Sequence, residues 1–169
     1  MGRAPLKQPT NDRGLTAVEL IIVIALVSLL AGVAVASAGR MSAAARARAG
    51  AEHLASLLSQ AITLASSENT QARVVLTRGA WPPRVELMRS GTWVDVTAEL
   101  ARVRTAATPP GQVWVASTTY PSDTFTAGRD TQSALVVASE GTATLEAGYG
   151  MTARVQTTRL GRVCLEVCP

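Results

Sequence analysis

The longest apolar stretch of the chain lies near its start. Residues 20–39, which follow Glu19, carry no charged side chain, and the next charge is Arg40. Twenty helical residues rise about 30 Å, which matches the thickness of the hydrocarbon core of a bilayer. A carboxylate one helical turn inside such a segment costs roughly 3 kcal/mol to insert into lipid. The pattern therefore predicts a helix that can span a membrane and in which Glu19 has a partner.

A second apolar pattern with a helical period follows. Six residues at i, i+3, i+4, i+7, i+8 and i+11 share one helix face: Leu54, Leu57, Leu58, Ala61, Ile62 and Ala65. No proline occurs between Pro9 and Pro82. We therefore expect one helix from about Thr16 to about Ser67, whose second half covers a soluble domain. The alanine-rich, basic stretch 40–51 is expected to be a solvated part of it, near lipid head groups.

After residue 69 the apolar period changes to two, which is the period of half-buried strands. Turn residues such as Ser90-Gly91 and Leu160-Gly161 separate the apolar runs. Strands are expected at 73–77, 84–88, 92–96, 113–116, 134–138, 142–146, 153–157 and 162–167. Residues 117–133 are expected to form a loop. A long helix packed on a mostly antiparallel sheet belongs to the α+β class.

The residues ahead of the apolar segment form a short basic leader. It holds three basic residues and one acidic residue: Arg3, Lys7, Arg13 and Asp12. Basic residues before an apolar segment stay in the cytoplasm, so the carboxyl-terminal domain is expected on the outer side. An ordinary secretory signal is the alternative, because residues 34–38 loosely fit a small-residue cleavage pattern. That alternative leaves Glu19 unexplained, and the helical pattern continues past the supposed cut.

This arrangement resembles the amino terminus of type IV pilins and type II secretion pseudopilins. The resemblance lies in Gly14, the uncharged residues 15–18, Glu19 and the apolar run after it. In that family a membrane-embedded prepilin peptidase cuts after the glycine and methylates the new amino terminus. The resemblance implies cleavage between Gly14 and Leu15, N-methylation of Leu15, and pairing of Glu19 with the amino terminus of an adjacent subunit. Family members usually have phenylalanine in place of Leu15, and many type IV pilins have a proline in place of Ala36.

The carboxyl-terminal part is similar to the GspH/FimT-type minor pseudopilins. The shared pattern consists of Leu135-Val136-Val137 with Gly141, then Arg154-Val155, then Gly161-Arg162-Val163. The resemblance implies a leader at 1–14, a transmembrane or filament-core helix at 15–39 and a periplasmic pilin-like α+β domain at 40–169. The implied protein is a single-pass protein of the bacterial inner membrane that enters a periplasmic pseudopilus. Its implied partners are other pseudopilins or pilins, the prepilin peptidase and the inner-membrane assembly platform.

The implied function is that of a minor pseudopilin, a structural subunit involved in protein secretion across the outer membrane. The alternative is a FimT-type minor type IV pilin that acts in pilus assembly or DNA uptake. The DNA-uptake subset carries Gly-Arg-x-Arg, whereas Cys164 replaces the second arginine here. Arg154, Arg159 and Arg162 fall on one predicted hairpin and are candidate phosphate contacts. Without the leader the formal charge falls from +4 to +2, so charge alone does not favour nucleic acid as a partner.

The two cysteines, Cys164 and Cys168, lie at the end of the chain. An exported domain meets an oxidising compartment, so a disulfide between them is allowed. Residues four apart on one strand have Cα atoms about 13 Å apart, and a disulfide needs less than about 7 Å. Bridging therefore requires the chain to turn back after Val167, and the sequence leaves both the bridged and the free state open.

Neither a catalytic nor a metal-binding set of residues is visible in the sequence. His53 is the only histidine, and it lies far from the two cysteines, which have no second pair to complete a zinc site. Trp81, Trp93 and Trp114 each lie in or beside an expected strand and are expected to pack in the core. We therefore expect a protein that is not an enzyme and binds neither cofactor nor metal.

Overall fold

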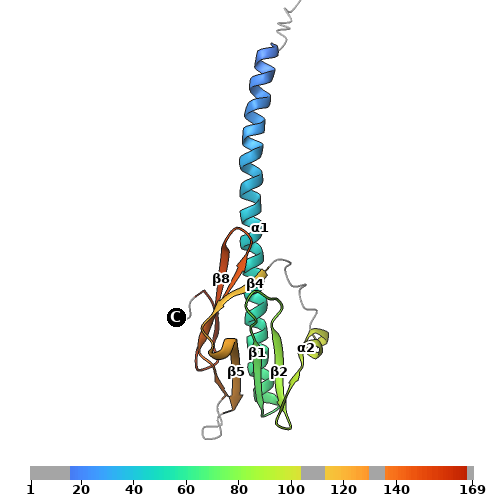
Figure 1. The fold of residues 1–169 in the computed structure, drawn as a ribbon, viewed down its shortest axis with the longest axis vertical. Helices are drawn as coiled ribbons and strands as arrows, with labels where there is room; N and C mark the ends of the chain where they lie inside the picture. Colours follow the sequence, from blue (N-terminus) through green and yellow to red (C-terminus); the bar gives the residue numbers. More distant parts are fainter. Residues whose placement is uncertain (1–15, 104–112, 130–135, 167–169) are drawn as a thin grey trace, which may run out of the picture. The chain divides into compact units, whose positions relative to one another are not determined.

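The computed structural model describes residues 16–103, 113–129 and 136–166. The fold is α+β, as the sequence predicts, and it combines one long amino-terminal helix with antiparallel sheets. The chain divides into two compact units, residues 1–38 and residues 39–169. The first described unit is the apolar part of the helix. The second contains the rest of the helix and every described strand (Figure 1).

Helix α1 (Ala17–Ser67) begins and ends within a residue of the expected bounds. Within the second unit it buries the expected apolar stripe, with Ile62 partly buried and the other five residues buried. Three alanines extend the buried stripe toward the amino terminus: Ala43, Ala47 and Ala51. The expectation that residues 40–51 are simply solvated is therefore wrong for this face. These alanines are spaced four apart, and their small side chains let α1 approach the sheets closely.

The strands form two sheets rather than one. The first sheet has the order β3-β2-β1-β5-β6, and the second has the order β4-β7-β8-β9. The first sheet contains β1 (Gln71–Val75), β2 (Arg84–Arg89), β3 (Thr92–Asp95), β5 (Thr124–Arg129) and β6 (Val136–Ala138). The second sheet contains β4 (Val113–Thr118), β7 (Gly141–Ala147), β8 (Met151–Thr157) and β9 (Val163–Leu165). All neighbouring strands within each sheet are antiparallel.

The segment expected to be a loop at 117–133 contains a central strand, so that expectation is wrong. After the short turn η1 (Pro121–Asp123), β5 pairs with both β1 and β6. Its alternation places Phe125 and Ala127 in the core, where both are fully buried. A short helix, α2 (Thr97–Val103), was also not expected. The last strand, β9, ends at Leu165 instead of Val167.

A hydrogen-bonded chain of hydroxyl groups crosses the core near the end of the second sheet. The Tyr120 hydroxyl lies 3.0 Å from Thr157 Oγ1, and the Thr157 hydroxyl donates to the Ser139 carbonyl at 2.7 Å. Thr157 is fully buried, so these bonds satisfy a polar group that would otherwise destabilise the fold. Burial raises the pKa of Tyr120, and the hydrogen bond to Thr157 opposes that rise.

All three tryptophans are partly buried: Trp81 packs against the core as expected, whereas Trp93 and Trp114 do not. Trp93 pairs with Met88 and alternates with the inward-facing row, so it lies on the outer face of the first sheet. There the Arg73 guanidinium lies over its ring at 4.1 Å and also pairs with Glu86 at 2.6 Å. Trp114 likewise alternates with the buried Val113 and Val115 on β4. The Trp93 and Trp114 rings therefore lie on the outer faces of different sheets.

Candidate functional site

Thr16 and Glu19 are hydrogen-bonded to each other at the amino-terminal end of α1. The Glu19 carboxylate oxygen Oε2 accepts hydrogen bonds from the Thr16 backbone N–H at 2.9 Å and from the Thr16 hydroxyl at 3.0 Å. The Glu19 N–H lies 3.3 Å from Thr16 Oγ1. This reciprocal arrangement is a capping box, which satisfies backbone donors that the first helical turn leaves free.

The capping box gives Glu19 a partner within its own chain. Sequence reasoning missed this partner, although Thr-x-x-Glu ahead of an apolar run is the signature of the motif. Both accepted bonds reach Oε2, and among the described residues no hydrogen bond reaches Oε1. Glu19 therefore keeps one oxygen for a second partner. Gly14 and Leu15, the expected cleavage site, lie outside the described residues.

The apolar part of α1 has no covering partner in the described chain. Its large apolar side chains, from Val18 to Val35, are half exposed or more. Its two hydroxyls are satisfied internally, because Ser28 donates to the Ile24 carbonyl at 2.8 Å and Ser37 donates to the Ala34 carbonyl at 2.9 Å. The helix is long and apolar enough to cross a membrane, a criterion that a signal sequence near an amino terminus also meets.

The three candidate arginines all lie on the β8–β9 hairpin and are exposed. Arg154 alternates with the buried Val155, so it faces away from the core. Arg159 lies in the turn, and Arg162 immediately precedes β9. None of the three forms an ion pair with a described residue, and each is therefore available to an external anion.

The hairpin register spreads these arginines along the strands. Arg154 lies opposite Glu166, whose N–H donates to the Arg154 carbonyl at 2.9 Å. Arg162 lies opposite Thr158, whose N–H donates to the Arg162 carbonyl at 2.9 Å. Thr158 follows Arg154 by four positions, a distance of about 13 Å along an extended strand. The structure thus brings the arginines onto one hairpin but does not converge them on a single point.

Cys164 lies in β9 opposite Gln156 and is disulfide-bonded. Cys168, the only other cysteine of the sequence, lies outside the described residues. Glu166 has a φ of 72°, so the backbone leaves the extended conformation directly after Leu165. The sequence predicted that a disulfide would need a turn after Val167, and the bend is found one residue before Val167, at Glu166.

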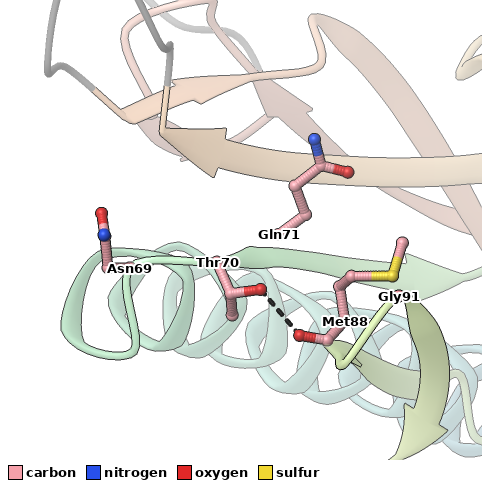
Figure 2. A pocket seen from close by; sticks show the side chains of 5 residues that line it. All are labelled: Asn69, Thr70, Gln71, Met88 and Gly91. Atoms are coloured by element: carbon pink, nitrogen blue, oxygen red, sulfur yellow. Dashed lines mark hydrogen bonds between the residues drawn. The ribbon is translucent and has the colours of Figure 1, made fainter.

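An open pocket of about 450 Å³ lies where α1 meets β1 (Figure 2). Five residues line it: Asn69, Thr70, Gln71, Met88 and Gly91. The Thr70 hydroxyl closes one side by donating to the Met88 carbonyl at 2.7 Å, as the dashed line in Figure 2 shows. None of the five side chains titrates near neutral pH, so the pocket offers neither an acid, a base nor a nucleophilic thiol for chemistry.

His53 is partly buried and lies beside an aromatic ring. Its ring packs on Trp81 with 5.7 Å between ring centroids, and burial lowers its pKa. The indole N–H of Trp81 is buried without a hydrogen-bond partner among the described residues. In the described part of the chain, no group of three or more His, Cys, Asp or Glu residues is placed to hold a metal ion.

Comparisons of the chain with family models, with curated proteins and with solved structures gave no match. The strongest candidate site is the capped start of α1, where Glu19 lies at the beginning of an uncovered apolar segment. A carboxylate in such a segment is costly unless it has partners.

Proposed function

We propose that the chain is a minor pseudopilin, a structural subunit of a type II secretion pseudopilus. The observation that carries this proposal is the start of α1, where Glu19 is held in a capping box directly ahead of 20 uncharged residues. A soluble enzyme has no use for such an uncovered apolar helix. A subunit that is stored in a bilayer and then packed into a filament requires one.

The capping box supports a specific role for Glu19 in assembly. Cleavage after Gly14 creates an ammonium group on Leu15, which a filament core would bury. Glu19 Oε2 is held by Thr16, and the remaining oxygen can accept a hydrogen bond from the Leu15 ammonium of an adjacent subunit. The attraction between these charges is stronger in an apolar core than in water. The box thus fixes the carboxylate before the neighbour arrives.

The second unit supports a mechanical role rather than a chemical one. It contains the rest of α1, whose stripe from Ala43 to Ala65 is buried in the same core as both sheets. A force applied to the amino-terminal segment would therefore reach the domain through a continuous helix. We infer that the domain is exposed to the periplasm while the apolar segment lies in the inner membrane.

Processing provides the direct test. Mass spectrometry of the protein extracted from membranes is expected to show an amino terminus at N-methyl-Leu15. Gly14→Val should block cleavage and leave the leader attached, whereas Gly2→Val in the leader should leave cleavage unchanged. An amino terminus at Ser37 or Gly39 would identify an ordinary signal peptide and contradict the proposal.

A second candidate function, DNA binding in uptake, is favoured by the three exposed arginines without ion pairs on the β8–β9 hairpin. Their spread along the hairpin predicts few simultaneous phosphate contacts and hence a shallow dependence of affinity on salt. A titration of the full chain in detergent with duplex DNA at several salt concentrations tests this function. Tight binding at about 150 mM salt that is lost in Arg162→Ala would favour DNA uptake over secretion.

A further inference from the structure

The turn between β7 and β8 contains a tyrosine in a backbone conformation that bulky residues rarely adopt. Gly148, Tyr149 and Gly150 connect the two strands, and Tyr149 has a φ of 63°. A bulky residue is strained in this left-handed region, and glycine or asparagine would suit the turn better. A strained residue of this kind points to a use for its side chain.

The Tyr149 side chain lies against α1 at one particular residue. A Cβ atom built on Gly39 would lie 3.0 Å from the Tyr149 hydroxyl oxygen and 3.2 Å from its Cζ. The Tyr149 residue is nevertheless 68% exposed, and its hydroxyl has no hydrogen-bond partner among the described residues. The ring therefore contacts the helix on one side and is open to its surroundings on the other.

Gly39 is the last residue of the uncharged run, and the side chains that follow it suit a membrane surface. Arg40 is exposed and forms no ion pair with a described residue. Met41 is 74% exposed. A cation at the end of an apolar span is attracted to anionic lipid head groups. The Tyr149 ring, which is apolar with one polar end, lies beside this boundary and matches the residues that line membrane interfaces.

We propose that the β7–β8 turn is a second membrane contact, in which the Tyr149 ring inserts among the phospholipid head groups beside the emerging helix. This inference rests on the proposed insertion of α1 in the inner membrane. The contact would limit rotation of the whole subunit about the helix axis before assembly. Leaving the bilayer for the filament would then release Tyr149 together with the apolar span.

The test uses the full chain in vesicles of phosphatidylethanolamine and phosphatidylglycerol. An environment-sensitive dye is attached to Gly148→Cys, where a Cβ has no heavy atom within 4 Å. Labelling without reductant avoids Cys164, which is disulfide-bonded. The matched control is Leu160→Cys in the β8–β9 turn, because Leu160 is 84% exposed in another turn of the same sheet. Nitroxide-labelled head groups are the quencher.

We expect head-group quenching to be several-fold stronger at position 148 than at position 160. Adding Tyr149→Ser should reduce quenching at 148 to the level at 160, whereas Tyr149→Trp should preserve it. Equal quenching at the two positions, or quenching at 148 that survives Tyr149→Ser, would overturn the inference. Protection of the dye at position 148 from quenching that increases with the amount of protein per lipid would indicate that the Tyr149 ring contacts a second subunit. This result would also overturn the inference.

A third label separates this inference from the proposed function. A dye on Gly32→Cys lies within the apolar span, where a Cβ also has no neighbour within 4 Å. Acyl-chain nitroxides should quench it if α1 is inserted. Quenching at 32 without quenching at 148 would overturn the role of the turn and leave insertion intact. Absence of quenching at 32 would overturn both.

Discussion

Gly141 lies so close to the ring of Tyr120 that a Cβ atom at position 141 would be 2.5 Å from Tyr120 Cδ1. No real Cβ tolerates that distance, so either the ring or the strand must move. The ring has little room, because Tyr120 is buried, is hydrogen-bonded to Thr157 and packs edge-on against Phe125. Gly141 therefore allows β7 to begin directly beside a core aromatic.

We predict that Gly141→Ala destabilises the second unit by about 1–3 kcal/mol, the usual cost of overpacking a core. Urea unfolding of the full chain in detergent, followed by near-ultraviolet circular dichroism, measures the change in the free energy of unfolding. Gly148→Ala is the matched control, because its Cβ would meet nothing within 4 Å. The control should be neutral or slightly stabilising, since alanine restricts the unfolded chain. Equal stability of the two variants would show that Tyr120 yields easily.

A second prediction separates the two roles of Glu19. Glu19→Gln keeps an oxygen that can accept from Thr16 and removes the charge that would pair with an ammonium. We expect Glu19→Gln to be cleaved normally after Gly14 but incorporated poorly into filaments, because a buried ammonium without its partner costs several kcal/mol. Sheared-filament yields and mass spectrometry measure the two outcomes.

Thr16→Ser is the control for the capping role, because serine retains the hydroxyl of the capping box. It should be processed and assembled like the wild type. Assembly of Glu19→Gln at wild-type levels would mean that Glu19 serves only to cap its own helix.

A third prediction concerns acid sensitivity at His53. Burial lowers the pKa of His53 in the folded chain, so near pH 6 the unfolded chain binds more protons at this site. Stability must then fall as the pH drops below about 6.5, the pKa of an unburied histidine, until it levels below the lowered folded-state pKa. Unfolding free energies measured from pH 7.5 to pH 5 should show this slope, and His53→Gln should remove its contribution. A wild-type slope in His53→Gln would assign the acid sensitivity to carboxylates instead.

The helix and the class of the fold could be predicted from the sequence because their signals are local. The stripe from Leu54 to Ala65 and the absence of proline gave the bounds of α1 to within a residue. Strand β5 was missed because it is short, follows the turn residue Pro121 closely and contains Gly128, which reads as a turn signal. The division into two sheets depends on which distant strands pair, and the local patterns of a single sequence do not predict this pairing.

The candidate site was predictable only in part, for a different reason. The cost of inserting Glu19 into lipid predicted a partner, and the resemblance placed that partner on an adjacent subunit. The capping motif formed with Thr16 in the same chain was overlooked. The Tyr149 contact with Gly39 could not be read from the sequence at all, because it joins a hairpin turn to a helix residue far away in the chain. The outward position of Trp93 was readable from strand alternation with the inward-facing row, and the core-packing expectation overlooked it.

The last prediction is that residues 40–169 fold without the apolar segment. Every buried side chain of the described core lies between Ala43 and Thr157, so removing residues 1–39 removes none of them. The deletion also removes Gly39, which the exposed Tyr149 ring contacts. The fragment should be a soluble monomer with a single cooperative unfolding transition. The matched control is residues 52–169, which lacks the buried Ala43, Ala47 and Ala51. Because that deletion exposes the part of the core that these alanines cover, the shorter fragment should unfold at lower urea and aggregate. Size-exclusion chromatography and urea titration distinguish the two, and aggregation of 40–169 itself would show that the domain depends on its apolar segment.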